Sequence, residues 1–339
     1  MDSARFLALV GALRGRTVAV VGDAVADEFV YGRVARVSRE APVLILEYDS
    51  TEVVAGGAGN AANNVAALGG RAVLVAVVGR DEPGRRLIAS LHRGVDRRSV
   101  IRAPGHATAV KTRILAGGVH SAKQQVVRID RSVNRSPDAR AQAAFERAAI
   151  DAAVRADAVL LSDYGSGLVT PAFASRIRAS LRRQRADRPI LIDTRYRLLG
   201  YTGLTACTPN ESEVEQALGV RINDNRRVLE KAGRRILEQT RMRAVLITRG
   251  SRGMALFVPG EATLHIPIFG SDEIADVTGA GDTVMATMAL ALAAGGSFES
   301  AARLANYAGG LVVMKRGTAT VSADELKAAV AAQGPEPKA

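Results

Sequence analysis

Residues 158–163 read AVLLSD, residues 190–193 read ILID, and residues 171–183 between them read PAFASRIRASLRR. The two short apolar runs are typical of strands that are buried on both faces, and the segment between them has apolar residues at helical spacing. A strand, a helix and a second strand in this order predict a parallel unit. This stretch therefore predicts an α/β fold.

The same alternation continues through most of the chain. We expect further strands at TVAVVG (17–22), AVLVAVVG (72–79), TACTPN (205–210) and AVLITRG (244–250), and further helices over 85–93, 138–155, 211–218 and 226–239. The pattern predicts a doubly wound, mostly parallel sheet flanked by helices. Several strands end in polar or glycine-bearing turns, and open α/β sheets bind ligands beyond these carboxyl ends.

Two segments break this alternation. Residues 29–55 and 108–130 have strand-like runs without helical patterns inside them. We expect them to form a small β flap that covers the site as a second lobe. Residues 1–330, with the flap included, are then one domain, and the short polar tail at 331–339 is expected to be disordered.

The composition predicts a globular protein of the cytoplasm. Of the 339 residues, 47% are hydrophobic, which is enough for a large core. The N-terminal stretch carries Arg5 within a short apolar run and lacks a cleavage site, and no apolar run approaches the roughly 20 residues of a membrane helix. The single cysteine, Cys207, suits a reducing compartment. We expect neither secretion nor membrane insertion.

The formal charge of +12 raises the question of nucleic-acid binding. Basic pairs such as Arg85-Arg86, Arg182-Arg183 and Arg234-Arg235 fall on different expected helices, and tryptophan is absent, so neither a continuous basic stripe nor a stacking platform is visible. We therefore expect no nucleic-acid partner. A basic surface does concentrate small anionic substrates such as nucleotides and sugar phosphates.

The most informative stretch for chemistry is DVTGAGDT at 276–283, which is followed directly by the helical run VMATMALALAAG. Glycines ahead of a helix allow backbone N–H groups to converge at its positive end, where an anion binds. Asp282 would then be a base that takes a proton from a nucleophile, while Gly279, Ala280 and Gly281 hold a phosphoryl group. A capped helix start has the same spacing, so spacing alone leaves both interpretations open.

A second glycine stretch, GGAGNAA at 56–62, satisfies the dinucleotide-binding pattern G-x-G-x-x-A, with Asp81 at a plausible distance. The preceding residues EYDSTEVVA are polar and irregular, whereas that pattern needs a buried strand. A dinucleotide-binding oxidoreductase stays an alternative at this point. The sequence has no phosphate loop of the G-x-x-x-x-G-K-[ST] type, no G-x-S-x-G motif and no metal-ligand spacing among its four histidines.

Taken together, GGAGNAANNVAALGG at 56–70 with VGRDEPG at 78–84, and DVTGAGDTV at 276–284, resemble the two signatures of the ribokinase (PfkB) family of carbohydrate kinases. GDAVAD (22–27), TPNESE (208–213), TRGSRG (248–253) and Asn306 resemble further landmarks in the family's order. The resemblance covers about residues 16–325. It implies a ribokinase-like fold and phosphoryl transfer from ATP to a sugar hydroxyl.

The resemblance also implies residue roles. Asp282 is the general base, and Gly279, Ala280 and Gly281 supply the anion hole. The remaining roles are substrate binding by Asp27, Gly57 and Asn60; ATP binding by Asn210, Thr248, Arg249, Gly250, Gly253 and Asn306; Mg²⁺ held through water by Glu213; and a monovalent cation such as K⁺ held by Asp276, Thr278 and carbonyls around Gly317.

Within the family, the nearest likeness is to kinases of D-glycero-D-manno-heptose 7-phosphate, carried by RVSREAPV (36–43), QQVVRID (124–130) and LSDYGSG (161–167). This likeness implies transfer to C1 of the heptose 7-phosphate, and a kinase half without the nucleotidyltransferase domain of bifunctional relatives. Ser166 and Arg195 stand where such kinases often carry lysine, and AGGVHSAK (116–123) lengthens the flap hairpin.

Four basic flap residues, Arg36, Lys111, Arg113 and Arg128, are candidates for binding a distal phosphate of the acceptor, because guanidinium groups match phosphate oxygens. The free strand edges of the flap favour a homodimer. The alternatives are a kinase of the same family with ribose, fructose, fructose 6-phosphate or a nucleoside as acceptor, the oxidoreductase, and a catalytically silent sugar- or nucleotide-binding regulator.

Overall fold

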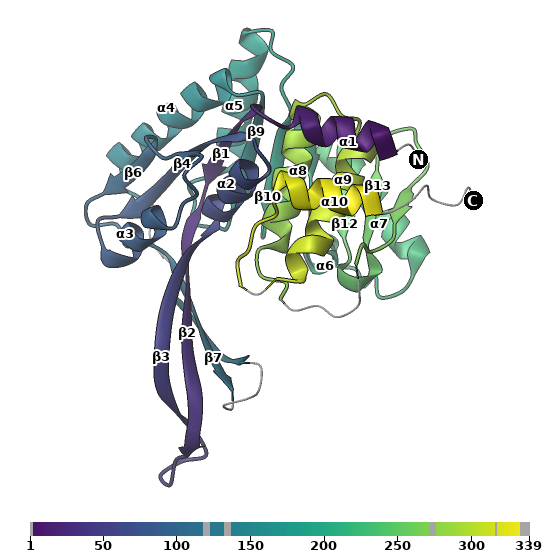
Figure 1. Cartoon of the computed structure of the whole chain (residues 1–339). Helices are drawn as coiled ribbons and strands as arrows, with labels where there is room; N and C mark the ends of the chain where they lie inside the picture. Colours follow the sequence, from purple (N-terminus) through teal and green to yellow (C-terminus); the bar gives the residue numbers. More distant parts are fainter. Residues whose placement is uncertain (1–2, 118–122, 132–136, 271–275, 316, 333–339) are drawn as a thin grey trace.

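The computed structural model describes residues 3–117, 123–131, 137–270, 276–315 and 317–332. Its body is a mostly parallel sheet between two layers of helices, and a long β arm projects from one side of the body (Figure 1). The expected α/β fold with a flap is confirmed. In the part of the chain that the structure describes, no helix combines the length and apolar character needed to cross a membrane.

Within the described residues, the central sheet has ten strands. In spatial order they are β14 (Leu264–Ile266), β13 (Met254–Phe257), β12 (Ala244–Thr248), β11 (Ala206–Cys207), β10 (Ile190–Thr194), β9 (Ala158–Asp163), β1 (Thr17–Gly22), β4 (Arg71–Gly79) and β5 (Val95–Asp96), with β6 (Val100–Ala103) also paired to β4. All these pairs are parallel except β12–β13 and β13–β14. The chain moves outward from β1 in one direction and then, from β9, in the other, so the strand order reverses between β1 and β9.

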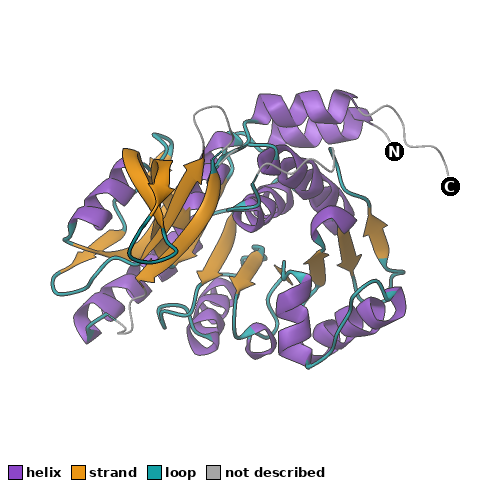
Figure 2. Cartoon of the chain, turned by 90° about the horizontal axis from the view of Figure 1, so that it is seen from below, coloured by secondary structure: helices purple, strands orange, loops and turns teal. Residues whose placement is uncertain are grey.

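Helices cover both faces of this sheet (Figure 2). One face carries α1 (Ser3–Ala12), α2 (Ala58–Ala67), α3 (Glu82–Ala89), α8 (Ala280–Ala293), α9 (Phe298–Val313) and α10 (Ala323–Ala332), and the other carries α4 (Ala139–Arg155), α5 (Pro171–Arg183), α6 (Glu211–Leu218) and α7 (Arg226–Thr240). Two short 3-10 helices, η1 (Leu198–Gly200) and η2 (Gly250–Arg252), follow β10 and β12.

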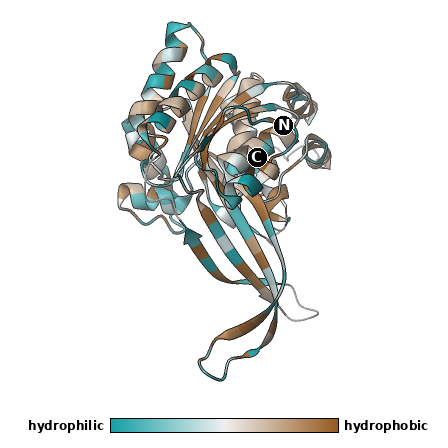
Figure 3. Ribbon diagram, turned by 90° about the vertical axis from the view of Figure 1, so that its left-hand side faces the viewer, coloured by the Kyte–Doolittle hydropathy of each residue, from teal (hydrophilic) through white to brown (hydrophobic). Residues whose placement is uncertain are grey.

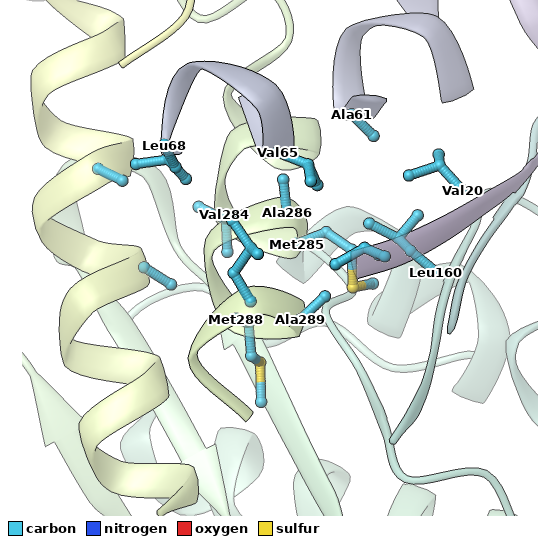
Figure 4. Packing of buried hydrophobic residues seen from close by; sticks show 14 of the residues in the cluster. Val20, Ala61, Val65, Leu68, Leu160, Val284, Met285, Ala286, Met288 and Ala289 are labelled. Carbon is cyan, nitrogen blue, oxygen red and sulfur yellow. The ribbon is translucent and has the colours of Figure 1, made fainter. Parts of the chain in front are cut away.

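The strands are apolar throughout because alternate side chains enter opposite layers. In β1, Val18 and Val20 belong to one buried cluster, whereas Ala19 and Val21 belong to the other. The first cluster is centred on α8, whose Met285 and Ala286 lie between α2 and the strands β1 and β9 (Figure 4). Burial on nearly all sides fixes the position of this helix, and therefore of its N-terminus.

The flap is a four-stranded sheet in the order β3-β2-β7-β8. Its strands are β2 (Ala24–Val37), β3 (Leu44–Gly57), β7 (Val110–Gly117) and β8 (Gln124–Arg131). β2 pairs with β3 in antiparallel and with β7 in parallel orientation. Brown, apolar stretches colour much of its outer half (Figure 3), and the exposed apolar side chains there include Val37, Leu44 and Tyr48.

Several boundaries differ from the expected ones. The helix expected at 85–93 is α3, which starts at Glu82 because Asp81 caps it, accepting a hydrogen bond from Gly84 N at 3.0 Å, and Pro83 lies in its first turn. The strand expected at 205–210 is only two residues long. Of the tail expected to be disordered at 331–339, residues 331 and 332 belong to α10, and 333–339 lie outside the described residues, as do 118–122 of the lengthened flap hairpin.

Candidate active site

Two cavities adjoin at the carboxyl edge of the sheet, next to the reversal of strand order between β1 and β9. The first, of about 290 Å³, lies between the flap and the body, and we call it the flap cavity. The second, of about 440 Å³, lies beside α8 and α9, and we call it the helix cavity. An edge of this kind, at a switch in strand order, is where open α/β sheets bind their ligands.

The helix cavity brings together most of the residues that the sequence predicts for phosphoryl transfer and ATP binding. Its lining includes Asn210, Glu213, Thr248, Gly250, Gly253, Gly279, Ala280, Gly281, Asp282 and Asn306. These residues come from five separate strand ends and helices, spread over nearly 100 residues of sequence. Asn306 also donates a hydrogen bond to Pro267 O at 2.9 Å, so its amide links α9 to the segment beyond β14.

The glycine loop forms the N-terminus of α8 at the wall of this cavity. Gly279 precedes the helix with φ of 77°, a left-handed conformation, and a Cβ there would lie 2.4 Å from Asn60 Nδ2. Gly281 has neither constraint: a Cβ would meet nothing within 4 Å. The two glycines therefore have different reasons for being glycine, conformation at 279 and free space in the cavity at 281.

Asp282 lies in the first turn of α8 and is 4% exposed. Its carboxylate accepts hydrogen bonds from Asn60 Nδ2 at 2.9 Å and from the Tyr164 hydroxyl at 3.2 Å. Burial raises the pKa of Asp282 to about 7, and the nearby charge of Asp193 acts in the same direction. A carboxylate with this pKa is matched to accepting a proton near neutral pH.

Asn210 and Glu213 form a reciprocal capping box at the start of α6. Asn210 Oδ1 accepts from Glu213 N at 2.9 Å, and Glu213 Oε2 accepts from Asn210 N at 2.9 Å. Glu213 is also part of the lining of the helix cavity. Burial raises the pKa of Glu213 to about 7 and that of Asp193 to about 6.

The helix cavity therefore holds Asp193, Glu213 and Asp282, three carboxyl groups whose ionised forms are all disfavoured. A divalent cation on a nucleotide would relieve this clustering of negative charge, and oxygen donors are those that Mg²⁺ prefers. Within the described residues, no group of three His, Cys, Asp or Glu side chains has the geometry of a self-sufficient metal site. The donor set thus fits a Mg²⁺ ion that arrives with phosphate and water ligands.

The predicted monovalent-cation residues also lie together. Asp276 Oδ1 accepts from Thr278 N at 2.8 Å, and its Oδ2 accepts from Gly317 N at 3.1 Å, which joins the loop before α8 to the segment after α9. Neither Asp276 nor Thr278 lines the helix cavity itself. The side-chain oxygens of Asp276 and Thr278 are hard donors that suit a K⁺ ion.

The flap cavity is lined by two of the four predicted phosphate-binding residues, Lys111 and Arg128. Arg128 is paired with Asp130 through two hydrogen bonds of 2.7 and 2.6 Å. Asp23 and Ser166 line the inner wall, where the Ser166 hydroxyl donates to the Asp23 carboxylate. The cavity thus combines cations on the flap side with hydrogen-bonding groups on the sheet side.

The other two predicted flap cations lie elsewhere. Arg113 forms a buried ion pair of 2.6 Å with Asp27, and neither side chain lines a cavity described above. Arg36 is exposed near the far end of β2, nine residues beyond Asp27, which pairs in register with Lys111. At about 3.3 Å per residue, Arg36 is roughly 30 Å further along the flap, so it does not share a phosphate with Lys111 of the same chain.

Three further predicted residues have contacts within the protein. Asn60, expected to bind substrate, is buried and donates a hydrogen bond to Asp282. Gly57 precedes α2, and a Cβ there would lie 2.4 Å from the backbone oxygen of Asp23. The Arg249 side chain donates to Glu211 at 2.6 Å and is absent from the lining of the helix cavity.

The structure bears on the dinucleotide alternative in two ways. The segment before α2, expected to be irregular, is the strand β3, but it belongs to the flap and not to the central sheet. Asp81 caps α3 and also holds Thr108, whose hydroxyl donates to Asp81 Oδ1 at 2.6 Å. The carboxylate that would bind a ribose in that alternative therefore serves the fold.

Several residues of the two cavities were not assigned roles from the sequence, among them Asp23, Tyr164, Asp193 and Arg195. All four lie at or just after the ends of β1, β9 and β10. Their position at the carboxyl ends of neighbouring strands was the available signal, because the parallel sheet brings these ends to one edge.

Comparison with known proteins identifies the family of the chain. The model of the pfkB family of carbohydrate kinases matches residues 16–325. The bifunctional protein HldE of Caulobacter vibrioides is 41% identical over 333 residues, which are 96% of this chain and 66% of that protein. The chain therefore spans just under two thirds of this relative's length.

Solved structures show the same fold at low identity. Arabidopsis thaliana ribokinase complexed with ribose and ATP has a TM-score of 0.71 and 20% identity, over 94% of this chain and 99% of that one. Escherichia coli phosphofructokinase-2 in complex with potassium has a TM-score of 0.68 and 17% identity, over 94% and 99% of the two chains. The chain belongs to the pfkB family of carbohydrate kinases, which are ATP-dependent sugar kinases.

Proposed function

We propose that the protein transfers the γ-phosphoryl group of ATP to a hydroxyl of a sugar phosphate. The observation that supports this most directly is the buried Asp282 at the N-terminus of α8, on a cavity that adjoins a second, cation-lined cavity. ATP would occupy the helix cavity and the sugar phosphate the flap cavity. The glycine loop and the base would then face the atoms that react.

In this mechanism the oxygen of the acceptor hydroxyl forms a bond to the γ-phosphorus, and Asp282 accepts the proton of that hydroxyl. The bond from the γ-phosphorus to the bridging oxygen of ADP breaks, and ADP leaves with that electron pair. Backbone N–H groups of Gly279, Ala280 and Gly281 stabilise the negative charge on the phosphoryl oxygens. Asn60 and Tyr164 keep the carboxylate of Asp282 directed at the hydroxyl.

Magnesium and potassium are the proposed ions. Glu213, with Asn210 beside it, would hold a magnesium ion through water, and such an ion supplies charge neutralisation to the phosphates. Asp276 and Thr278, with carbonyls near Gly317, would hold a potassium ion. Escherichia coli phosphofructokinase-2, which has the same fold, was solved in complex with potassium. Equal rates in potassium and lithium at one ionic strength would contradict the monovalent site.

The proposed acceptor is D-glycero-D-manno-heptose 7-phosphate, phosphorylated at C1. Lys111 and Arg128 on the flap cavity are suited to a phosphate, and relatives named HldE support a heptose-phosphate substrate. Because the chain spans under two thirds of these relatives, the proposal concerns the kinase reaction alone. ATP and sugar phosphates are metabolites of the cytoplasm, where we propose that the protein acts.

A homodimer is the proposed assembly, with the flap as its interface. The flap exposes Val37, Leu44, Tyr48, Val127 and Ile129, each at least 48% exposed, and it has unpaired strand edges. A second copy of the chain would cover both. Sedimentation of the unmodified protein and of Val127→Asp tests this, and a monomer in both cases would contradict it.

A coupled assay of ADP release over a panel of acceptors tests the function. The panel contains the heptose 7-phosphate, the free heptose, fructose 6-phosphate, ribose, fructose and a nucleoside. We expect kcat/KM to be highest for the heptose 7-phosphate. A higher kcat/KM for another sugar of the panel would replace the proposed acceptor. If the protein is folded and binds ATP but turns over none of these acceptors, the kinase proposal is contradicted.

A further inference from the structure

Two residues, Tyr164 and Arg195, line both the flap cavity and the helix cavity, and no other described residue does so. Tyr164 directly follows β9 and Arg195 directly follows β10, and these two strands are parallel neighbours. The pair therefore lies where the two cavities meet. If ATP and the acceptor occupy the two cavities, the phosphoryl group crosses at this point.

Arg195 rests on the ring of Tyr164. Its Cζ lies 4.6 Å from the ring centroid, and Lys111 Nζ, which comes from the flap, lies at the same distance from the same centroid. The tyrosine hydroxyl in turn contacts Asp282 at 3.2 Å. One aromatic side chain thus contacts two cations and the proposed base.

Among the residues that the structure describes, these two cations have no carboxylate partner of their own. No described carboxylate lies within 4.0 Å of either charged group, whereas Arg113, Arg128 and Arg249 each have one. Burial, together with the positive charge of Arg195, lowers the pKa of Lys111. Two neighbouring cations without counter-charges attract an anion to the junction of the two cavities.

We propose that Arg195 binds the γ-phosphoryl group during its transfer, with the Tyr164 ring holding the guanidinium at the junction of the cavities. This proposal rests on the proposed kinase function and adds a side-chain cation to the backbone N–H groups of the glycine loop. A guanidinium that lies over a ring face can still donate its N–H groups to phosphate oxygens. A preorganised charge at that position stabilises the negative charge that develops on the phosphoryl oxygens.

The planarity of the guanidinium distinguishes arginine from lysine here. Arginine stacks on an aromatic face and donates several hydrogen bonds at once, whereas a lysine ammonium is a point charge on a flexible chain. Arg195→Lys is therefore expected to keep part of the effect, and Arg195→Met to lose it. Arg197→Met is the matched control, because Arg197 is an exposed arginine of the same turn that lines neither cavity.

The experiment compares kcat and the acceptor KM of the three variants with those of the unmodified enzyme. We expect Arg195→Met to reduce kcat by about 10²-fold, the size of the loss when one donor to a developing charge is removed. The acceptor KM should change little, Arg195→Lys should be intermediate, and Arg197→Met should stay within twofold. A kcat within twofold for Arg195→Met, or a rise in acceptor KM alone, would overturn the proposal.

A binding measurement separates this proposal from the kinase function itself. Calorimetry with magnesium and either the non-hydrolysable analogue AMP-PNP or ADP should show that Arg195→Met weakens AMP-PNP about tenfold while ADP is unaffected, because only AMP-PNP carries a γ-phosphoryl group. Equal affinities of the variant and the unmodified protein for AMP-PNP would count against Arg195. Failure of the unmodified protein to bind either nucleotide would count against the kinase function and not against Arg195 specifically.

Discussion

The Asn60 side-chain amide donates a hydrogen bond of 2.9 Å to Asp282 Oδ2, across 222 residues of sequence. It joins the two glycine-rich stretches that characterise the family, one before α2 and one before α8. Asn64 holds Asn60 in place. Its side-chain amide donates a hydrogen bond to Asn60 Oδ1 and accepts one from the Thr283 hydroxyl at 3.0 Å. The first glycine-rich stretch therefore orients Asp282, the proposed base, which the second one carries.

Replacement of Asp282 by asparagine should abolish most phosphoryl transfer without unfolding the protein. The amide cannot accept the hydroxyl proton, so we expect kcat to fall by roughly 10²- to 10⁴-fold while nucleotide binding persists. Steady-state kinetics and calorimetry with ATP measure the two effects. Near-normal turnover of Asp282→Asn would remove it as the base.

The pH dependence should report the same carboxyl group. Because Asp282 must be ionised to act and its pKa is raised to about 7, kcat/KM should rise as the pH passes through about 7. The Tyr164 hydrogen bond lowers this pKa, so Tyr164→Phe should move the rise to higher pH. An unmoved profile in Tyr164→Phe would contradict this coupling.

Ionisation of Asp282 should make the folded protein less stable as the pH rises. A carboxyl group with a higher pKa in the folded protein than in the unfolded chain binds its proton more tightly when folded, so its ionisation withdraws stability as the pH rises. The window runs from its ordinary value of 3.8 to about 7. Thermal unfolding should therefore show Asp282→Asn above the unmodified protein in Tm at pH 8, with a smaller difference at pH 5. A difference that is equal at both values would contradict the raised pKa.

Substitutions of the two loop glycines, Gly279 and Gly281, should impair the enzyme for different reasons. Gly279→Ala places a Cβ on a left-handed residue and against Asn60, so it should lower both Tm and kcat. A Cβ at residue 281 would have no atom within 4 Å, so Gly281→Val should leave Tm nearly unchanged while kcat falls, because the side chain enters the proposed space of the phosphates. Unimpaired turnover of Gly281→Val would show that no phosphoryl group approaches this residue.

The flap cations should differ in their contribution to acceptor selection. Lys111 lines the flap cavity, whereas Arg36 lies roughly 30 Å further along the flap, so Lys111→Met should lose far more of the preference for the heptose 7-phosphate over the free heptose than Arg36→Met. The measurement is kcat/KM for both sugars at one salt concentration, because exposed charge pairs weaken with ionic strength. A larger loss in Arg36→Met would contradict the assignment of the flap cavity to the phosphate.

The fold class, the flap and the residues around Asp282 could be predicted because they rest on local patterns. Apolar runs of strand length and helical periodicity reflect burial residue by residue, and the boundaries of α5 and α6 agree with those expected from the sequence. The short edge strands β13 and β14 were not among the strands expected from the sequence, and their antiparallel direction depends on pairing and not on local composition.

The sequence by itself determined which loop could bind a phosphoryl group and which carboxylate lies in it, since glycine, acid and helix are adjacent along the chain. Only the tertiary structure decided which charges are available to a ligand. Arg113 forms an ion pair with Asp27, and the length of β2 places Arg36 far from the cavity. Lys111 and Arg195, by contrast, both contact the ring of Tyr164. The physical reason is that ion pairing and distance depend on contacts between residues far apart in the chain, which neither periodicity nor residue type encodes.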